Sequence, residues 1–142
     1  MAEQVALLDF GSNAVRFVHA HLSRRGVRFI YEGRVRARLA SGANGSLDRL
    51  AIEHTLQAAA RFLHRVRPED PRVLAIATAS VRDAANAELL LSRLPELGVP
   101  RLRILTGIEE ATLGAESALR SVPLRNGAVI DLGGGSLQWT AA

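Results

Sequence analysis

Two stretches near the ends of the chain repeat one pattern: VALLDFGSNAVRF at residues 5–17 and AVIDLGGGSLQW at residues 128–139. Each has an apolar run, an aspartate, one large apolar residue, and then glycine with small polar residues. A short apolar run that stops at such turn residues is typical of a buried strand. The aspartate would then stand at the carboxyl end of a strand, where open α/β sheets bind ligands. The sequence therefore predicts two copies of one strand-and-turn unit.

The residues between the two stretches first show strand patterns and then alternate between helix and strand patterns. Three alternating segments with short connections predict an antiparallel meander. The strands that follow are separated by helices, which indicates a parallel part of a mixed sheet. The predicted strands are residues 5–9, 14–22, 27–39, 73–78, 102–105 and 128–132, and the predicted helices are residues 47–66, 83–97 and 109–119. The expected fold is α/β: a mixed five-stranded sheet with flanking helices in the order βββαβαβα, followed by the first strand or hairpin of a second, similar unit.

Composition supports a folded domain and narrows its class. The chain has 142 residues, of which 48% are hydrophobic, and this is enough for one aliphatic core. It has no cysteine, which excludes disulfides and thiolate metal sites and favours a cytoplasmic protein. We expect no signal peptide and no membrane span, because charged residues interrupt the apolar runs. The net charge is +4 and every basic residue is arginine, but acidic residues are interspersed, so we expect no nucleic-acid partner.

The Asp–Gly turns carry a specific chemistry. Carboxylates at these positions can hold Mg²⁺, and glycines let backbone N–H groups point at an anion. Ser12, Asn13 and Ser136 can add side-chain donors. One Asp-x-Gly turn alone could be an ordinary tight connection, but two copies with matched strands favour a phosphate clamp.

With these motifs the chain resembles the exopolyphosphatase and guanosine pentaphosphate phosphatase family, within the superfamily of actin, Hsp70 and sugar kinases. LLDFGSNAVRF is similar to the first phosphate motif of the family, and VIDLGGGS to the second. AIATASVRDAAN at residues 75–86 and ILTGIEEATLG at residues 104–114 are similar to two segments between them. The resemblance runs through nearly the whole chain with the motifs in order. It implies a ribonuclease-H-like lobe at residues 1–124 and the start of a second lobe at residues 125–142.

The resemblance also implies roles for individual residues. Glu110 matches the catalytic glutamate that activates water, and Asp9 and Asp131 match the aspartates near the metal. Arg82 matches a phosphate-binding arginine. The remaining phosphate-binding positions are Gly11, Ser12, Asn13, Gly133, Gly134, Gly135 and Ser136. Each residue also has an ordinary structural interpretation: Arg82 as a surface arginine, Glu109 and Glu110 as acids at a helix N-terminus, and Asn13 as a turn residue.

The implied activity is hydrolysis of a phosphoanhydride bond with Mg²⁺ or another divalent cation. The substrate would be inorganic polyphosphate or guanosine penta- or tetraphosphate, and the first-lobe motifs do not distinguish them. Such a reaction needs positive groups on the transferring oxygens and a positioned water molecule. A carboxylate can orient that water and accept its proton.

Two departures from the family pattern open alternatives. The second loop usually continues with Ser-Thr-Glu, and here Leu137 and Gln138 follow Ser136, so an acid that could help to hold the metal is a neutral amide. The chain also ends just inside the second lobe. It could be an isolated lobe with little activity alone, a subunit that pairs with a second chain or copy, or a non-catalytic phosphate- or nucleotide-binding module; we favour the first.

Overall fold

The computed structural model of the protein describes residues 3–42, 44–66, 72–99, 101–122 and 126–141. A mixed five-stranded sheet forms its centre, as predicted, and its strand order is β3-β2-β1-β4-β5. The strands are β1 (Glu3–Phe10), β2 (Ala14–Ser23), β3 (Gly26–Arg36), β4 (Arg72–Ala77) and β5 (Leu102–Ile104). β1, β2 and β3 form the antiparallel meander, and β4 and β5 continue the sheet in parallel with β1.

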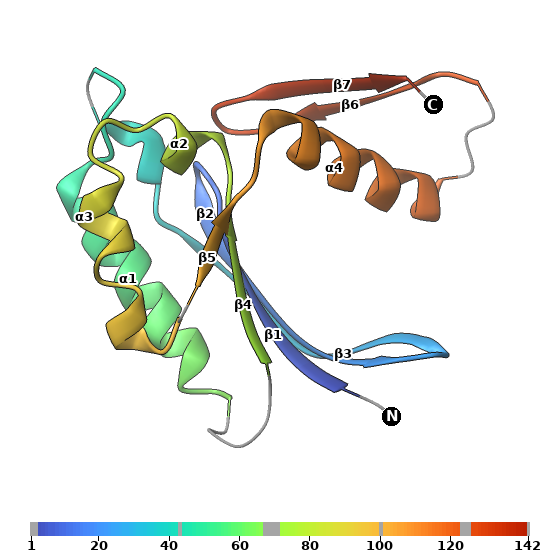
Figure 1. The fold of residues 1–142 in the computed structure, drawn as a ribbon, viewed down its shortest axis with the longest axis horizontal. Helices are drawn as coiled ribbons and strands as arrows, with labels where there is room; N and C mark the ends of the chain where they lie inside the picture. Colours follow the sequence, from blue (N-terminus) through green and yellow to red (C-terminus); the bar gives the residue numbers. More distant parts are fainter. Residues whose placement is uncertain (1–2, 43, 67–71, 100, 123–125, 142) are drawn as a thin grey trace.

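Helices cover one face of this sheet at its centre (Figure 1). α1 (Arg49–Leu63) and the short α3 (Glu88–Leu91) lie on that face. The side chains of Leu8, Phe10 and Phe17 point into the core there, and the Phe17 ring stacks on Phe62 of α1 with ring centroids 5.1 Å apart. Because side chains alternate along a strand, Asp9 points to the opposite face.

The prediction of one continuous helix at residues 83–97 is wrong. α2 (Ala79–Arg82) ends just before this region, which contains α3 and then a 3₁₀ turn η2 (Pro95–Leu97). The Asn86 side chain accepts a hydrogen bond from the Leu47 N–H at 2.7 Å and donates one to the Leu47 carbonyl at 3.0 Å. Because the Asn86 side chain bonds to the backbone of another segment, it favours an irregular local conformation over a continuous helix. Pro95 has no backbone N–H and so cannot donate a helical hydrogen bond.

The helix predicted at residues 47–66 is shorter in the structure, because α1 begins after its N-cap Asp48 and ends at Leu63, and two further boundaries shift. The third strand ends at Arg36 rather than at residue 39, because the N–H groups of Ala37 and Arg38 both donate to the Asn13 carbonyl at 3.0 Å. Residues Leu39–Ser41 then form the short 3₁₀ turn η1. The last predicted helix is longer: α4 spans Gly107–Ser121, since Thr106 and Glu109 form a capping box at its N-terminus.

The chain ends in a separate two-stranded hairpin, β6 (Ala128–Leu132) and β7 (Leu137–Ala141). The hairpin lies along α4, at the end of the sheet where β1 and β4 finish (Figure 1). The two ends of the sequence that share one motif are thereby brought together. Within the described residues, no helix is both long and apolar enough to cross a membrane.

Candidate active site

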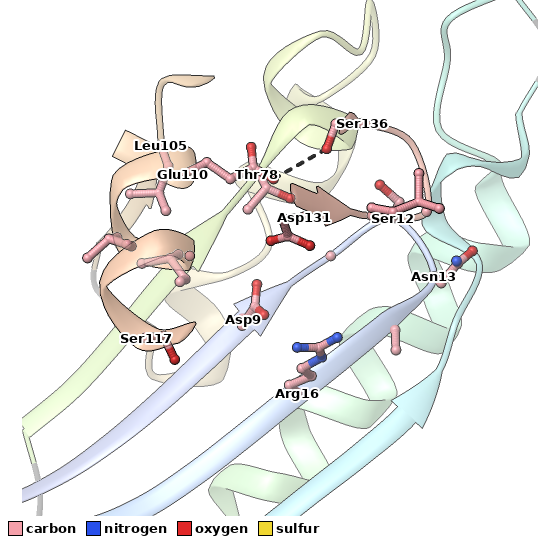
Figure 2. A pocket seen from close by; sticks show the side chains of 18 of the residues that line it. Asp9, Ser12, Asn13, Arg16, Thr78, Leu105, Glu110, Ser117, Asp131 and Ser136 are labelled. Carbon is pink, nitrogen blue, oxygen red and sulfur yellow. Dashed lines mark hydrogen bonds between the residues drawn. The ribbon is translucent and has the colours of Figure 1, made fainter. Parts of the chain in front are cut away.

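A cavity of about 510 Å³ lies where β1, α4 and the hairpin meet (Figure 2). Nine of the predicted site residues line it: Asp9, Gly11, Ser12, Asn13, Glu110, Asp131, Gly133, Gly134 and Ser136. These residues come from three segments that are far apart in the sequence. The fold therefore gathers most of the predicted site into one place.

The first Asp–Gly turn is held by backbone bonds. The Gly11 N–H donates to the Ala14 carbonyl at 3.1 Å, which turns the chain directly from β1 into β2. The Asn13 carbonyl accepts the two bonds that end β3. Because this backbone is anchored on both sides, the Ser12 and Asn13 side chains are presented from a fixed loop.

The second turn comes so close to the first that side chains on its glycines would displace Asn13 and crowd Ser12. The Gly133 N–H donates to the Ser136 carbonyl at 2.9 Å and closes the turn. A Cβ on Gly134 would overlap the Asn13 amide, and one on Gly135 would lie 3.0 Å from the Ser12 Oγ. Glycine at both positions thus permits the two loops to lie against each other.

Glu110 stands on the first turn of α4 and is held from both sides of the cavity. Its side chain is 15% exposed. One carboxylate oxygen, Oε2, lies 3.4 Å from the Arg82 Nη1, and the other, Oε1, lies 3.5 Å from the Ser136 Oγ. The Gln138 Nε2 donates to the same Ser136 Oγ at 2.8 Å. Glu110 is therefore linked to α2 on one side and to the hairpin on the other.

Two predicted phosphate-binding residues are not among those that line this cavity. Arg82 donates through Nη1 to the Leu105 carbonyl at 2.7 Å and through Nε to Asp83 at 3.2 Å, in addition to its contact with Glu110. Gly135 lines a neighbouring cavity of about 270 Å³, which shares Ser12 with the first. In this arrangement Arg82 contacts Glu110, and a direct contact of Arg82 with phosphate stays a prediction.

Asp9 and Asp131 provide negative charge at the centre of the site, and Figure 2 shows both carboxylates directed into the same space. Burial raises the pKa of Asp9 above its ordinary value, Arg16 opposes this rise, and Glu110 adds to it. The Asp9 Oδ1 is buried without a hydrogen-bond partner among the described residues. A carboxylate oxygen left in this state fits a cation ligand.

Two aspartates suit Mg²⁺ better than a cation whose ligands must all come from the protein. Among the described residues no group of three or more His, Cys, Asp or Glu side chains is arranged to hold a metal. Mg²⁺ is usually held by one or two carboxylates together with substrate phosphates and water. Asp9 and Asp131 can supply those carboxylates.

Sequence reasoning missed four polar residues that line the cavity: Arg16, Arg34, Thr78 and Ser117. Strand register was the signal that could have found the two arginines. In the sheet Arg16 lies opposite Asp9, and Arg34 lies opposite Arg16. Thr78 follows β4 directly, at the same edge of the sheet as Asp9.

Comparison with known proteins agrees with this geometry. The family model described as Ppx/GppA phosphatase matches residues 18–142. The chain belongs to the Ppx/GppA phosphatase family. A guanosine-5'-triphosphate,3'-diphosphate pyrophosphatase of Pseudoalteromonas atlantica is 31% identical over 96% of the chain, and exopolyphosphatase 1 of Mycobacterium leprae is 30% identical over 95% of it.

Solved structures show the same fold. A Ppx/GppA family member from Aquifex aeolicus superposes with a TM-score of 0.81 at 27% identity, and an exopolyphosphatase-like protein with a TM-score of 0.87 at 28% identity. The chain covers 48% and 45% of these two structures, and 28% and 42% of the two curated relatives. The chain thus spans less than half the length of each of these relatives.

Proposed function

We propose that the whole protein hydrolyses terminal phosphoanhydride bonds in inorganic polyphosphate or guanosine pentaphosphate. The observation that carries this proposal is the meeting of two Gly-rich loops and a carboxylate, Glu110, around one cavity. The names of the relatives, an exopolyphosphatase and a guanosine pentaphosphate pyrophosphatase, support the same reaction class. The proposal divides the chain into a lobe at residues 1–124 and the opening of a second lobe at residues 125–142.

In the proposed mechanism each group has one task. The backbone N–H groups of the two loops, with Ser12 and Asn13, hold the terminal phosphates, and Arg82 and Ser136 hold the Glu110 carboxylate in place. Glu110 orients a water molecule toward the terminal phosphorus and accepts its proton as the P–O bond to the leaving phosphate breaks. Mg²⁺, held through Asp9 and Asp131, would neutralise charge on the phosphate oxygens.

The proposal is tested by removing the carboxylate charge without changing its shape. We expect Glu110→Gln in the whole protein to lower kcat for phosphate release by at least about 100-fold and to leave the affinity for substrate within about threefold. Glu109→Gln is the matched control, because Glu109 caps α4 and pairs with Arg103 at an exposed site. Near-normal turnover by Glu110→Gln would show that Glu110 is not the general base.

A second candidate is a regulatory module that binds phosphate or nucleotide without turnover. Gln138 favours it, since the acid that usually follows the second loop is absent. This candidate predicts that tripolyphosphate and guanosine pentaphosphate bind while no phosphate is released at any divalent cation concentration. Phosphate release that depends on Glu110 would exclude it.

The proposed second lobe rests on the hairpin itself. One face of the hairpin is apolar and 66–80% exposed, and consists of Ile130, Leu132, Leu137 and Trp139. We infer that further polypeptide covers this face, either the remainder of a second lobe or a second copy of the chain. Analytical ultracentrifugation of the 142-residue chain distinguishes these: a monomer favours the first, and a dimer that Trp139→Glu dissociates favours the second.

A further inference from the structure

One row of charged residues crosses the open face of the sheet beside the cavity. Asp9 on β1 faces Arg16 on β2, and Arg16 faces Arg34 on the edge strand β3. Both arginines line the cavity, and Figure 2 shows Arg16 on the strand beside Asp9. The floor of the cavity therefore continues from the first phosphate loop into a pair of guanidinium groups.

The Arg16–Arg34 pair by itself destabilises the sheet, because both side chains are positively charged. Residues directly opposite each other on antiparallel strands have Cβ atoms about 4.5–5.5 Å apart, and like charges in such a pair destabilise the sheet. Among the described residues the ion pairs are formed by other arginines, namely Arg72, Arg82, Arg93 and Arg103. Arg16 lies opposite Asp9, but neither Arg16 nor Arg34 forms an ion pair among the described residues, and an anion between the two guanidinium groups would stabilise both.

A hollow on the far side of the pair limits the length of this positive surface. It has a volume of about 310 Å³, shares Arg16 and Arg34 with the cavity, and also contains Glu32. Glu32 lies on the same face of β3 as Arg34, two residues before it, and opposite Val18. An anion held by the arginines would be repelled if it extended toward Glu32.

We propose that Arg34, beside Arg16, forms a second phosphate subsite of the cavity, which binds a phosphate group of the substrate that lies beyond its terminal triphosphate. The subsite rests on the proposed function, because it places this group next to the loops that hold the terminal phosphate. Two substrates carry such a group: polyphosphate has internal phosphates, and guanosine pentaphosphate has a 3'-diphosphate. Glu32 closes the subsite at its outer end.

The test compares each larger probe with a smaller probe that lacks the additional phosphate groups. Binding to the whole protein is measured by isothermal titration with long-chain polyphosphate against tripolyphosphate, and with guanosine pentaphosphate against GTP. We expect Arg34→Gln to weaken binding of the larger probe in one pair about tenfold and binding of the smaller probe less than twofold. The affected pair identifies the source of the group.

Two further variants make the result specific. Glu32→Gln should have the opposite effect and strengthen binding of the same probe about two- to threefold, because it removes one negative charge near the anion. Arg28→Gln is the matched control, because Arg28 is exposed on the same strand but lies opposite His21, toward the other end of β3. In kinetics Arg34→Gln should raise KM and leave kcat within twofold, as expected for a group that binds substrate and transition state equally.

The inference is overturned if Arg34→Gln weakens large and small probes equally, if it weakens neither, or if Arg28→Gln has the same effect. Because binding is measured without a divalent cation, so that no turnover occurs, the result is independent of the hydrolase assignment. A protein that binds the larger probe through Arg34 but releases no phosphate would retain the subsite and refute the proposed hydrolysis.

Discussion

The two Asp–Gly turns have nearly the same local sequence but very different support. The first follows β1, whose Leu8 and Phe10 are fully buried beneath α1. The second connects β6 and β7, whose large apolar side chains are mostly exposed and whose described neighbour is α4. One loop of the site is therefore built on a packed core, and the other on a hairpin that packs on α4 and comes close to the first loop. The difference shows that one local motif can form on a packed core and on a largely exposed hairpin.

The sharpest way to test this contrast is to truncate one aromatic residue in each region. Phe17 is 1% exposed and Trp139 is 66% exposed. In the 142-residue chain we expect Phe17→Ala to lower the free energy of unfolding by about 3–5 kcal/mol, because it leaves a cavity beside Phe62. Trp139→Ala should change it by less than about 1 kcal/mol.

Chemical denaturation with circular dichroism measures both values. A loss for Trp139→Ala as large as that for Phe17→Ala would contradict the contrast between the regions. In the whole protein we expect the Trp139→Ala effect to grow to about 2–4 kcal/mol if a second lobe covers the hairpin.

A smaller effect is expected from restoring the missing acid at the second loop. Gln138 lies opposite Asp131 across the hairpin and donates to the Ser136 hydroxyl. A carboxylate there cannot donate this bond, but it places a further oxygen ligand beside Asp131. We expect Gln138→Glu to lower the Mg²⁺ concentration needed for half-maximal turnover by about tenfold.

The control for this variant is Gln138→Ala, which removes the donor without adding charge. If the two variants respond to Mg²⁺ alike, position 138 acts through Ser136 alone, and the carboxylate has no part in holding the cation.

The smallest predicted effect concerns the charge at the first loop. Burial raises the pKa of Asp9, with Arg16 opposing the rise and Glu110 adding to it, so ionised Asp9 costs stability at neutral pH. That cost is present above the raised pKa and disappears as the pH falls through it toward the ordinary aspartate value. Without divalent cations, Asp9→Asn should raise the melting temperature at pH 7 by roughly 2–6 °C, and this gain should shrink in acid.

Thermal melts at several pH values, with and without Mg²⁺, check this prediction. Mg²⁺ should stabilise the parent protein and leave Asp9→Asn nearly unchanged. Asp83→Asn is the control, because the Asp83 side chain is 67% exposed and lies outside the cavity lining. A lower melting temperature for Asp9→Asn at pH 7 would show that the ionised carboxylate is stabilised in the fold.

The sequence predicted the sheet and the meeting of the two turns because both depend on local patterns. Apolar runs that end at Asp and Gly fix where a strand stops, and the helices between them fix the parallel connection. The continuous helix at residues 83–97 was not found, because the Asn86 bonds to Leu47 link positions 39 residues apart, which periodicity does not record.

Nine of the predicted site residues come together in one cavity, and their roles stay predictions. Residues of the two turns and Glu110 stand in recognisable motifs, so their approach could be expected. Arg16 and Arg34 enter the cavity only through cross-strand register, and Arg82 is committed to Glu110 and a backbone carbonyl through tertiary contacts. These features depend on residues distant in sequence, and no single motif contains them.

The central claim is that both turns bind one phosphate chain, and binding stoichiometry tests it most directly. Tripolyphosphate with Mg²⁺ would be titrated calorimetrically into the whole protein carrying Glu110→Gln, which prevents turnover, and into the same protein with Asn13→Ala or Ser136→Ala added, one variant for each loop. We predict one site per chain, weakened about five- to tenfold by either substitution. Two independent sites, or full affinity in one of the two variants, would contradict the account.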